Sequence, residues 1–188
     1  MKKILLLTTI LATTHLDIFA QQTKQVLFIG NSYTANHDIP SIISNIASSA
    51  GNTLLYNAHT PGGAQFAQHA TNATVDALIR RGGWDAVVLQ EQSQLPSFRP
   101  ADVRVMVYPY ATQLVDKVRA VDSCTEVIFY NTWGRQRGDT QNCSYYPNVC
   151  TYEGMDDELF TNYEAMARDN EATLSPVGRV WRYLNVNY

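Results

Sequence analysis

The amino-acid sequence predicts an α/β protein with a parallel β-sheet that is covered by helices on both faces. Short apolar runs rich in β-branched residues alternate with longer segments whose apolar residues recur at helical spacing. Polar or glycine-rich residues follow each strand-like run. Because the carboxyl ends of parallel strands share one edge of a sheet, we expect these polar loops to meet there.

The expected strands are short and apolar, and each helix has a recognisable boundary. The first helix places Ile39, Ile42 and Ile46 on one face and stops at Gly51. Pro109 predicts a kink or a late start in the third helix. The strands are expected at residues 26–29, 53–57, 86–89 and 126–130, and the helices at 39–50, 66–80, 101–121 and 156–173.

Length and composition describe one globular domain. The chain has 188 residues, of which 45% are hydrophobic and 16% are charged, so it can bury a substantial core. The formal net charge of -3 gives no reason to expect nucleic acid or an anionic membrane surface as a partner. No apolar run is long enough to span a bilayer.

The first twenty residues have the pattern of a signal peptide. Lys2 and Lys3 precede a short apolar run, and Ala20 closes a segment that resembles a cleavage site. We therefore expect residues 1–20 to be removed and residues 21–188 to form a single domain in a secreted or periplasmic protein.

The cysteine pattern fits an exported protein. Cys143 and Cys150 bracket a short loop and are expected to form a disulfide in an oxidising compartment. Cys124 precedes an apolar strand, and we expect it to be a buried free thiol. Three cysteines without a C-x-x-C spacing and four scattered histidines give little reason to expect zinc, and no other metal or cofactor is indicated.

The loops after the strands contain the motifs that carry chemistry, and in block order they resemble the SGNH (GDSL-type) hydrolases. Gly30-Asn31-Ser32-Tyr33-Thr34 resembles the first block, in a branch that reads Gly-Asn-Ser. Gly62-Gly63 resembles the second block. Gln90-Glu91-Gln92-Ser93 stands where the family usually carries Gly-x-Asn-Asp, so the asparagine is absent. The resemblance covers roughly all of residues 21–188 and implies a flavodoxin-like three-layer α/β/α sandwich.

The resemblance also implies acyl transfer to water. Ser32 would be the nucleophile, and the amides of Ser32 and Gly63 would hold the oxyanion with the side-chain amide of Gln92 or Gln90. The resemblance implies that an exported hydrolase of this type removes acyl groups, above all acetyl groups, from carbohydrates. Other residues that could line the pocket are Asn31, Tyr33, His37, His59, Glu91, Trp133 and Arg135.

The chain departs from the family in its last block, Asp-x-x-His, which supplies the catalytic base. No histidine follows His69, which falls in a helical pattern and is expected on a helix face. The chain could be a fragment, a non-catalytic relative, or an enzyme in which His37 or His59 substitutes. We favour truncation and expect that the last strand or helix of the sandwich is missing. The alternative function is a non-catalytic secreted protein that binds carbohydrate or another partner.

Overall fold

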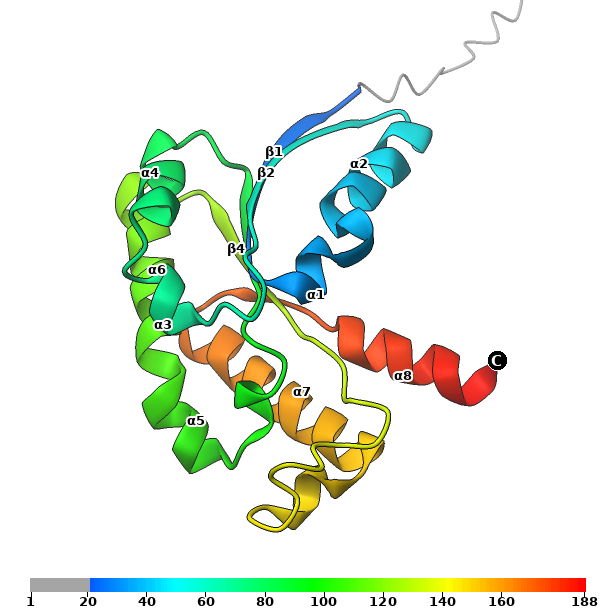
Figure 1. Cartoon of the computed structure of the whole chain (residues 1–188). Coiled ribbons are helices and arrows are strands. Elements are labelled where there is room, and N and C mark those ends of the chain that lie inside the picture. Colours follow the sequence, from blue (N-terminus) through cyan, green and yellow to red (C-terminus); the bar gives the residue numbers. More distant parts are fainter. Residues whose placement is uncertain (1–20) are drawn as a thin grey trace, which may run out of the picture.

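A parallel sheet of five strands runs through the middle of the protein, in the order β2-β1-β3-β4-β5 (Figure 1). The computed structural model describes residues 21–188, so the expected signal peptide lies outside the described residues. The strands are β1 (Thr23–Ile29), β2 (Thr53–His59), β3 (Ala86–Leu89), β4 (Glu126–Tyr130) and β5 (Thr173–Ser175).

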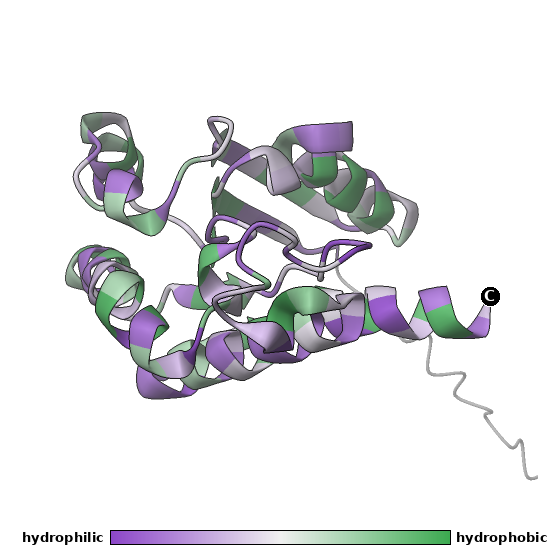
Figure 2. Ribbon diagram, turned by 60° about the horizontal axis from the view of Figure 1, so that its bottom comes forward, coloured by the Kyte–Doolittle hydropathy of each residue, from purple (hydrophilic) through white to green (hydrophobic). Residues whose placement is uncertain are grey.

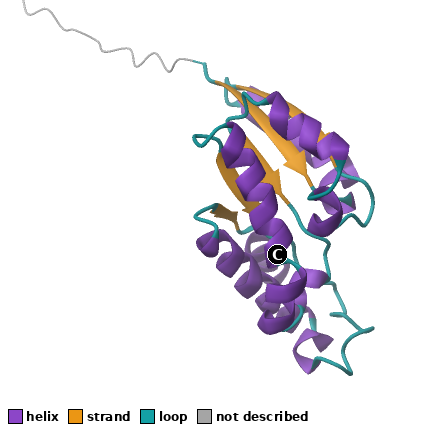
Figure 3. Ribbon diagram, turned by 90° about the vertical axis from the view of Figure 1, so that its left-hand side faces the viewer, coloured by secondary structure: helices purple, strands orange, loops and turns teal. Residues whose placement is uncertain are grey.

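Helices cover both faces of this sheet, as Figure 3 shows. In Figure 1, α2 and α8 lie on one side, and α4 and α6 lie on the other. Within residues 21–188, no helix combines the length and apolar character needed to cross a membrane. The helices are α1 (Ser32–Ala35), α2 (Ile39–Ser49), α3 (Phe66–His69), α4 (Ala73–Arg81), α5 (Pro100–Met106), α6 (Tyr108–Val121), α7 (Tyr152–Asp169) and α8 (Val177–Asn187), with 3₁₀ turns η1 (Asn36–Asp38), η2 (Leu95–Ser97) and η3 (Pro147–Cys150).

The alternation of side chains along β1 divides the core into two parts. Leu27 and Ile29 belong to the larger cluster, on the face covered by α3 to α7. Val26 and Phe28 point the other way and belong to a smaller cluster, which includes residues of α2 and α8. Both faces of the central strands are therefore buried, as expected for a parallel sheet, and the predicted flavodoxin-like three-layer sandwich is confirmed.

The strand order places a topological switch point between β1 and β3. The chain leaves β1 for β2 on one side and then crosses to β3 on the other side of β1. Ile29 pairs with Leu89, so the loops that begin at Gly30 and Gln90 leave the sheet side by side. Open α/β sheets bind ligands at this kind of position, and the Ser32 motif lies there.

Two of the predicted helices are each divided in the structure. The predicted helix at 66–80 is α3 and α4, because the Asn72 side chain accepts hydrogen bonds from the amides of Thr74 and Val75 and starts a new helix. The predicted helix at 101–121 is α5 and α6, with Pro109 in the first turn of α6.

The C-terminal part of the described chain differs most from the sequence prediction. The last predicted helix begins earlier, at Tyr152, because the Thr151 hydroxyl accepts a hydrogen bond from the Gly154 amide and caps it. The helix ends at Asp169, and residues 173–175 form β5 beside β4. The described chain therefore has a fifth strand that the sequence analysis did not list, and helix α8 follows it.

The structure confirms the Cys143–Cys150 disulfide, whose Cα atoms are 4.7 Å apart. The prediction for Cys124 is wrong in one respect, since this thiol is free but exposed. Cys124 lies in the turn before β4, where its amide donates to the Asp122 carboxylate, so its side chain does not reach the core.

Candidate active site

Hydrogen bonds join three of the four predicted loops at the carboxyl edge of the sheet. The Asn31 side chain donates a hydrogen bond to the Ala64 carbonyl, 2.9 Å away. The backbone amide of Asn31 donates to the side-chain oxygen of Gln90, 3.0 Å away. The fourth loop reaches the same place through Trp133, whose ring centroid lies 5.0 Å from that of Tyr33. The expected convergence of the loops after β1, β2, β3 and β4 is therefore confirmed.

Ser32 is the first residue of α1, and Asn31 is its N-cap. The Asn31 side-chain oxygen accepts a hydrogen bond from the Tyr33 amide, which fixes the turn. Gly30 is required here by close approach and not by a positive φ, since a Cβ atom would lie 2.7 Å from the Gln90 side-chain oxygen. Among residues 21–188, neither the hydroxyl nor the amide of Ser32 has a hydrogen-bond partner.

Gln90 is a structural link and not a free oxyanion donor. Its side chain is fully buried, and its Nε2 donates both to the Asn31 side chain and to the Glu91 carbonyl. Its Oε1 accepts from the Asn31 amide and the Thr34 hydroxyl. Because both amide hydrogens are occupied, the geometry disfavours the second of the two oxyanion candidates.

Gly63 and Gln92 have the geometry expected of free donors. Gly63 has a φ of +70° with open space where a Cβ would lie, and its amide has no partner within the described chain. The Gln92 Oε1 atom accepts from the amides of Gln94 and Leu95, 2.7 and 3.1 Å away. These bonds orient the side-chain amide, and its Nε2 makes no hydrogen bond within residues 21–188.

The Glu91 side chain is buried where the second and third loops meet. Both carboxylate oxygens accept from the Phe66 amide at the start of α3, at 3.1 and 3.0 Å, and one also accepts from the Gln92 amide at 2.5 Å. Burial raises the pKa of Glu91 from 4.5 to about 7, although these two amides act in the opposite direction. Asn31, also predicted as a pocket residue, is likewise buried.

The histidines occupy three different environments. His37 is exposed on η1 with a φ of +60°. His69 is in helix α3, as expected, on a face that is buried, and its Nε2 lies 2.9 Å from the Gly30 carbonyl. Burial lowers the pKa of His69 to about 4, against the effect of this hydrogen bond, and the neighbouring His59 lowers it further. No hydrogen bond within the described residues joins Ser32 to a histidine.

His59 lines a small cavity beside the second loop. The cavity has a volume of about 220 Å³ and is bounded by Gly62, Gly63 and His69. The rings of His59 and His69 have centroids 5.6 Å apart, and the buried His59 Nε2 has no hydrogen-bond partner within residues 21–188.

A larger cavity of about 690 Å³ begins at Tyr33, the neighbour of Ser32. Trp133 and Arg135, both predicted as pocket residues, line it. Arg135 also donates to the Ser93 hydroxyl, 3.3 Å away, and lies 3.7 Å from the buried Asp139 carboxylate. The loop after β4 is thereby held against the loop after β3.

Sequence reasoning missed the residues that α7 and α8 bring to this cavity. They lie outside the four predicted loops, and an isolated tryptophan or asparagine in a C-terminal segment has no motif around it. The missed lining residues from these two helices are Tyr152, Glu153, Trp181, Asn185 and Val186, and Gln136, next to Arg135 in the loop after β4, was missed as well. The sequence analysis also missed Tyr163 of α7, whose hydroxyl accepts a hydrogen bond from the Glu91 backbone amide at 3.0 Å.

No protein-family model and no curated protein matches the chain. Solved structures do match. A protein from Slackia heliotrinireducens, described as a candidate SGNH hydrolase, is 22% identical with a TM-score of 0.69, over 86% of this chain and 83% of that one. A DUF4886 family protein from Bacteroides uniformis is 16% identical with a TM-score of 0.66, over 83% and 68%.

A variant of an acetyl xylan esterase from Geobacillus stearothermophilus is 12% identical with a TM-score of 0.52, over 89% of this chain and 83% of that one. The strand order, the switch point and these likenesses agree with one another. The chain therefore has the fold of the SGNH (GDSL-type) hydrolases.

Proposed function

We propose that this protein is a serine esterase of the SGNH type, in which Ser32 is the nucleophile and acyl esters, above all acetyl esters, are the substrates. One observation carries the proposal. The Ser32 hydroxyl and the amides of Ser32 and Gly63 are all without partners within the described chain, at adjoining carboxyl ends of the sheet. A serine next to unpaired, fixed donors is the arrangement that acyl transfer requires.

In the proposed reaction, the Ser32 oxygen attacks the ester carbonyl and its proton passes to a base. The carbonyl oxygen becomes an oxyanion that accepts hydrogen bonds from the amides of Ser32 and Gly63 and from Gln92 Nε2. The leaving alcohol departs with a proton, and water then hydrolyses the acyl-serine to release the acid. Removing one such donor costs about 3–4 kcal/mol of transition-state stabilisation.

The general base of this reaction is not identified among the histidines of the 188-residue chain. No histidine follows His69 in the sequence, and the His69 Nε2 is already engaged by the Gly30 carbonyl. We therefore propose that this chain is impaired and that its rate reflects oxyanion stabilisation and binding alone, about 10³–10⁴-fold above water.

Carbohydrate esters are the proposed natural substrates. A structural neighbour is described as an acetyl xylan esterase, and aromatic rings lie beside Ser32. We also propose that the protein is exported, which the disulfide supports because such bonds persist in oxidising compartments.

The proposal is tested by hydrolysis of a chromogenic acetyl ester at pH 7–8. We compare the full chain with a form extended at its C-terminus by a segment that contains Asp-x-x-His, since the extension should raise activity by several powers of ten. In the active form, Ser32→Ala should remove nearly all activity and Ser93→Ala should retain it. The reverse result for the two serines would show that the nucleophile is assigned to the wrong loop.

The test also detects a substitute base. Full activity in the unextended chain, lost on His59→Ala or His37→Ala, would mean that a local histidine accepts the proton. The second candidate function is non-catalytic carbohydrate binding on a hydrolase scaffold, which the absence of a bond between Ser32 and any described histidine favours. Saccharide binding without ester turnover in the extended form would support it.

A further inference from the structure

The 690 Å³ cavity beside Ser32 contains a continuous row of three aromatic rings. Trp133 lies in the middle, with centroids 5.0 Å from Tyr33 and 5.9 Å from Trp181, at interplanar angles of 33° and 38°. Trp181, at the outer end, is 47% exposed. The row thus extends from the residue next to the proposed nucleophile to solvent.

Polar groups line the rest of this cavity. The polar residues that line it are Arg135, Gln136, Glu153 and Asn185. One basic and one acidic residue balance, so the cavity does not select a charged ligand. Its volume is within the range of small-molecule sites and well above the size of an acetyl group.

These features favour a neutral saccharide over an alkyl chain. A pyranose ring has apolar C–H faces that pack on aromatic rings and a rim of hydroxyls that needs hydrogen bonds. A long acyl chain would cover the rings but would also remove the polar side chains of Gln136 and Glu153 from water without offering them partners, which costs free energy. A saccharide can pack its C–H faces on the aromatic rings and form hydrogen bonds with the polar residues at the same time.

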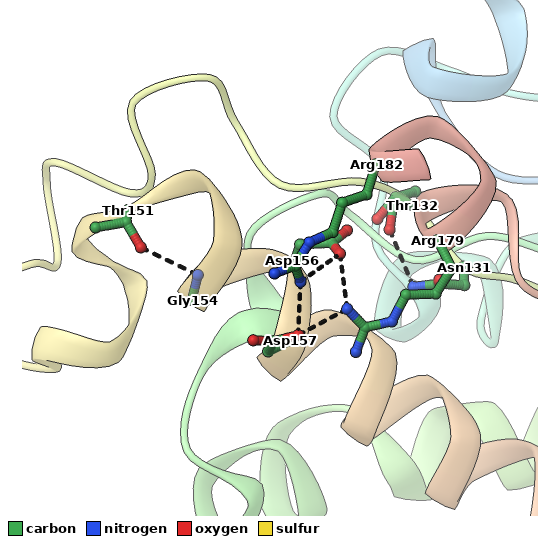
Figure 4. A network of polar contacts seen from close by, with 8 residues as sticks. All are labelled: Asn131, Thr132, Thr151, Gly154, Asp156, Asp157, Arg179 and Arg182. Atoms are coloured by element: carbon green, nitrogen blue, oxygen red, sulfur yellow. Dashed lines mark hydrogen bonds and ion pairs between the residues drawn. The ribbon is translucent and has the colours of Figure 1, made fainter. Parts of the chain in front are cut away.

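Helix α8 forms the outer wall, and ion pairs hold it in place. Arg179 and Arg182 each contact the carboxylates of Asp156 and Asp157 on α7, with the two Asp157 contacts at 2.6 and 2.7 Å (Figure 4). The Asp156 side chain is only 1% exposed. Figure 2 shows that α8 carries both apolar and polar residues. The ion pairs with Asp156 and Asp157 therefore add to apolar packing in holding α8 against α7.

We propose that the row formed by Tyr33, Trp133 and Trp181 is a saccharide subsite that holds the sugar part of the ester substrate, with α8 as its outer wall. The inference rests on the proposed function for the place of the ester next to Ser32, but the subsite binds sugar whether or not Ser32 reacts.

The test measures binding by the full chain carrying Ser32→Ala, with xylotetraose as the probe and decanoate as the alkyl comparator. Tryptophan fluorescence and calorimetry report the dissociation constant. We expect saturable xylotetraose binding that Trp181→Ala weakens by about 10-fold, the loss of one aromatic contact. Tyr183→Ala is the matched control, since Tyr183 is also on α8 and exposed but does not line the cavity.

The contrary results are distinct. No xylotetraose binding, or equal binding by the Trp181→Ala and Tyr183→Ala variants, would overturn the subsite. Decanoate binding that depends on Trp181 while xylotetraose does not bind would make the cavity an acyl-chain site instead. Failure of the esterase proposal would appear in a different assay: the C-terminally extended protein with Ser32 intact would not hydrolyse the acetyl ester.

Discussion

The buried carboxyl group of Glu91 should make the stability of the fold depend on pH in a predictable direction. Desolvation raises its pKa to about 7, above the 4.5 of an ordinary glutamate. A folded-state pKa above the unfolded value stabilises the fold below pH 4.5, and this contribution is lost as pH rises through 7. At about 1.36 kcal/mol per pKa unit, the loss is about 3 kcal/mol between pH 4 and pH 8.

The perturbation that isolates this effect is Glu91→Gln. Urea denaturation at pH 4 to 8 gives the free energy of unfolding of both proteins, and the wild-type value minus that of the Glu91→Gln variant should fall by about 3 kcal/mol across the range. Taking the difference cancels the contribution of His69, which titrates in the same range. Glu164→Gln is the control, because that residue is exposed on α7.

Two outcomes would refute the reasoning. A difference that is constant with pH would mean that Glu91 titrates as an ordinary glutamate, so that burial has no net effect. A difference that rises with pH would mean that the amides of Phe66 and Gln92 stabilise the carboxylate by more than burial destabilises it.

Three further predictions concern the disulfide, the first loop and export. Iodoacetamide should label only Cys124 in the folded, unreduced chain, and Cys143→Ser should lower the unfolding free energy by about 2 kcal/mol; labelling of a second cysteine would contradict the pairing. Gly30→Ala should destabilise the fold by about 1–3 kcal/mol because the new methyl group meets a buried amide oxygen 2.7 Å away, whereas Gly62→Ala, with nothing within 4 Å, should cost little by denaturant melts. N-terminal sequencing of the exported protein should start at or near Gln21, and recovery of intact Met1 from the exported pool would reject the signal peptide.

The sequence was most informative where a residue type has one strong local consequence. The strands at residues 86–89 and 126–130 have the predicted bounds, because an apolar β-branched run that is buried on both faces has few alternatives. The loops after the strands were found for the same reason, since parallel strands all end at one edge. The disulfide followed from two cysteines close in sequence.

What the sequence could not reveal depends on contacts between distant segments. The sequence places Gln92 before Gln90 as oxyanion donor but leaves both open. The hydrogen bonds of Gln90 to Asn31 and Thr34, which only the fold brings together, show that its side-chain amide is engaged. Strand β5 has three residues, too few for a periodic pattern, and its pairing with β4 defines it. Trp181 reaches the cavity because α8 is docked on α7 by charges, and no local pattern records that docking.

The central claim is that Ser32 is the nucleophile, and covalent labelling tests it most directly. The full chain is incubated with an alkyl fluorophosphonate, with imidazole added as a base, and peptide mass mapping then locates the adduct. The account predicts one adduct on Ser32, which is lost in Ser32→Ala and retained in Ser93→Ala. An adduct on Ser93 or another residue, or no adduct on Ser32, would contradict it.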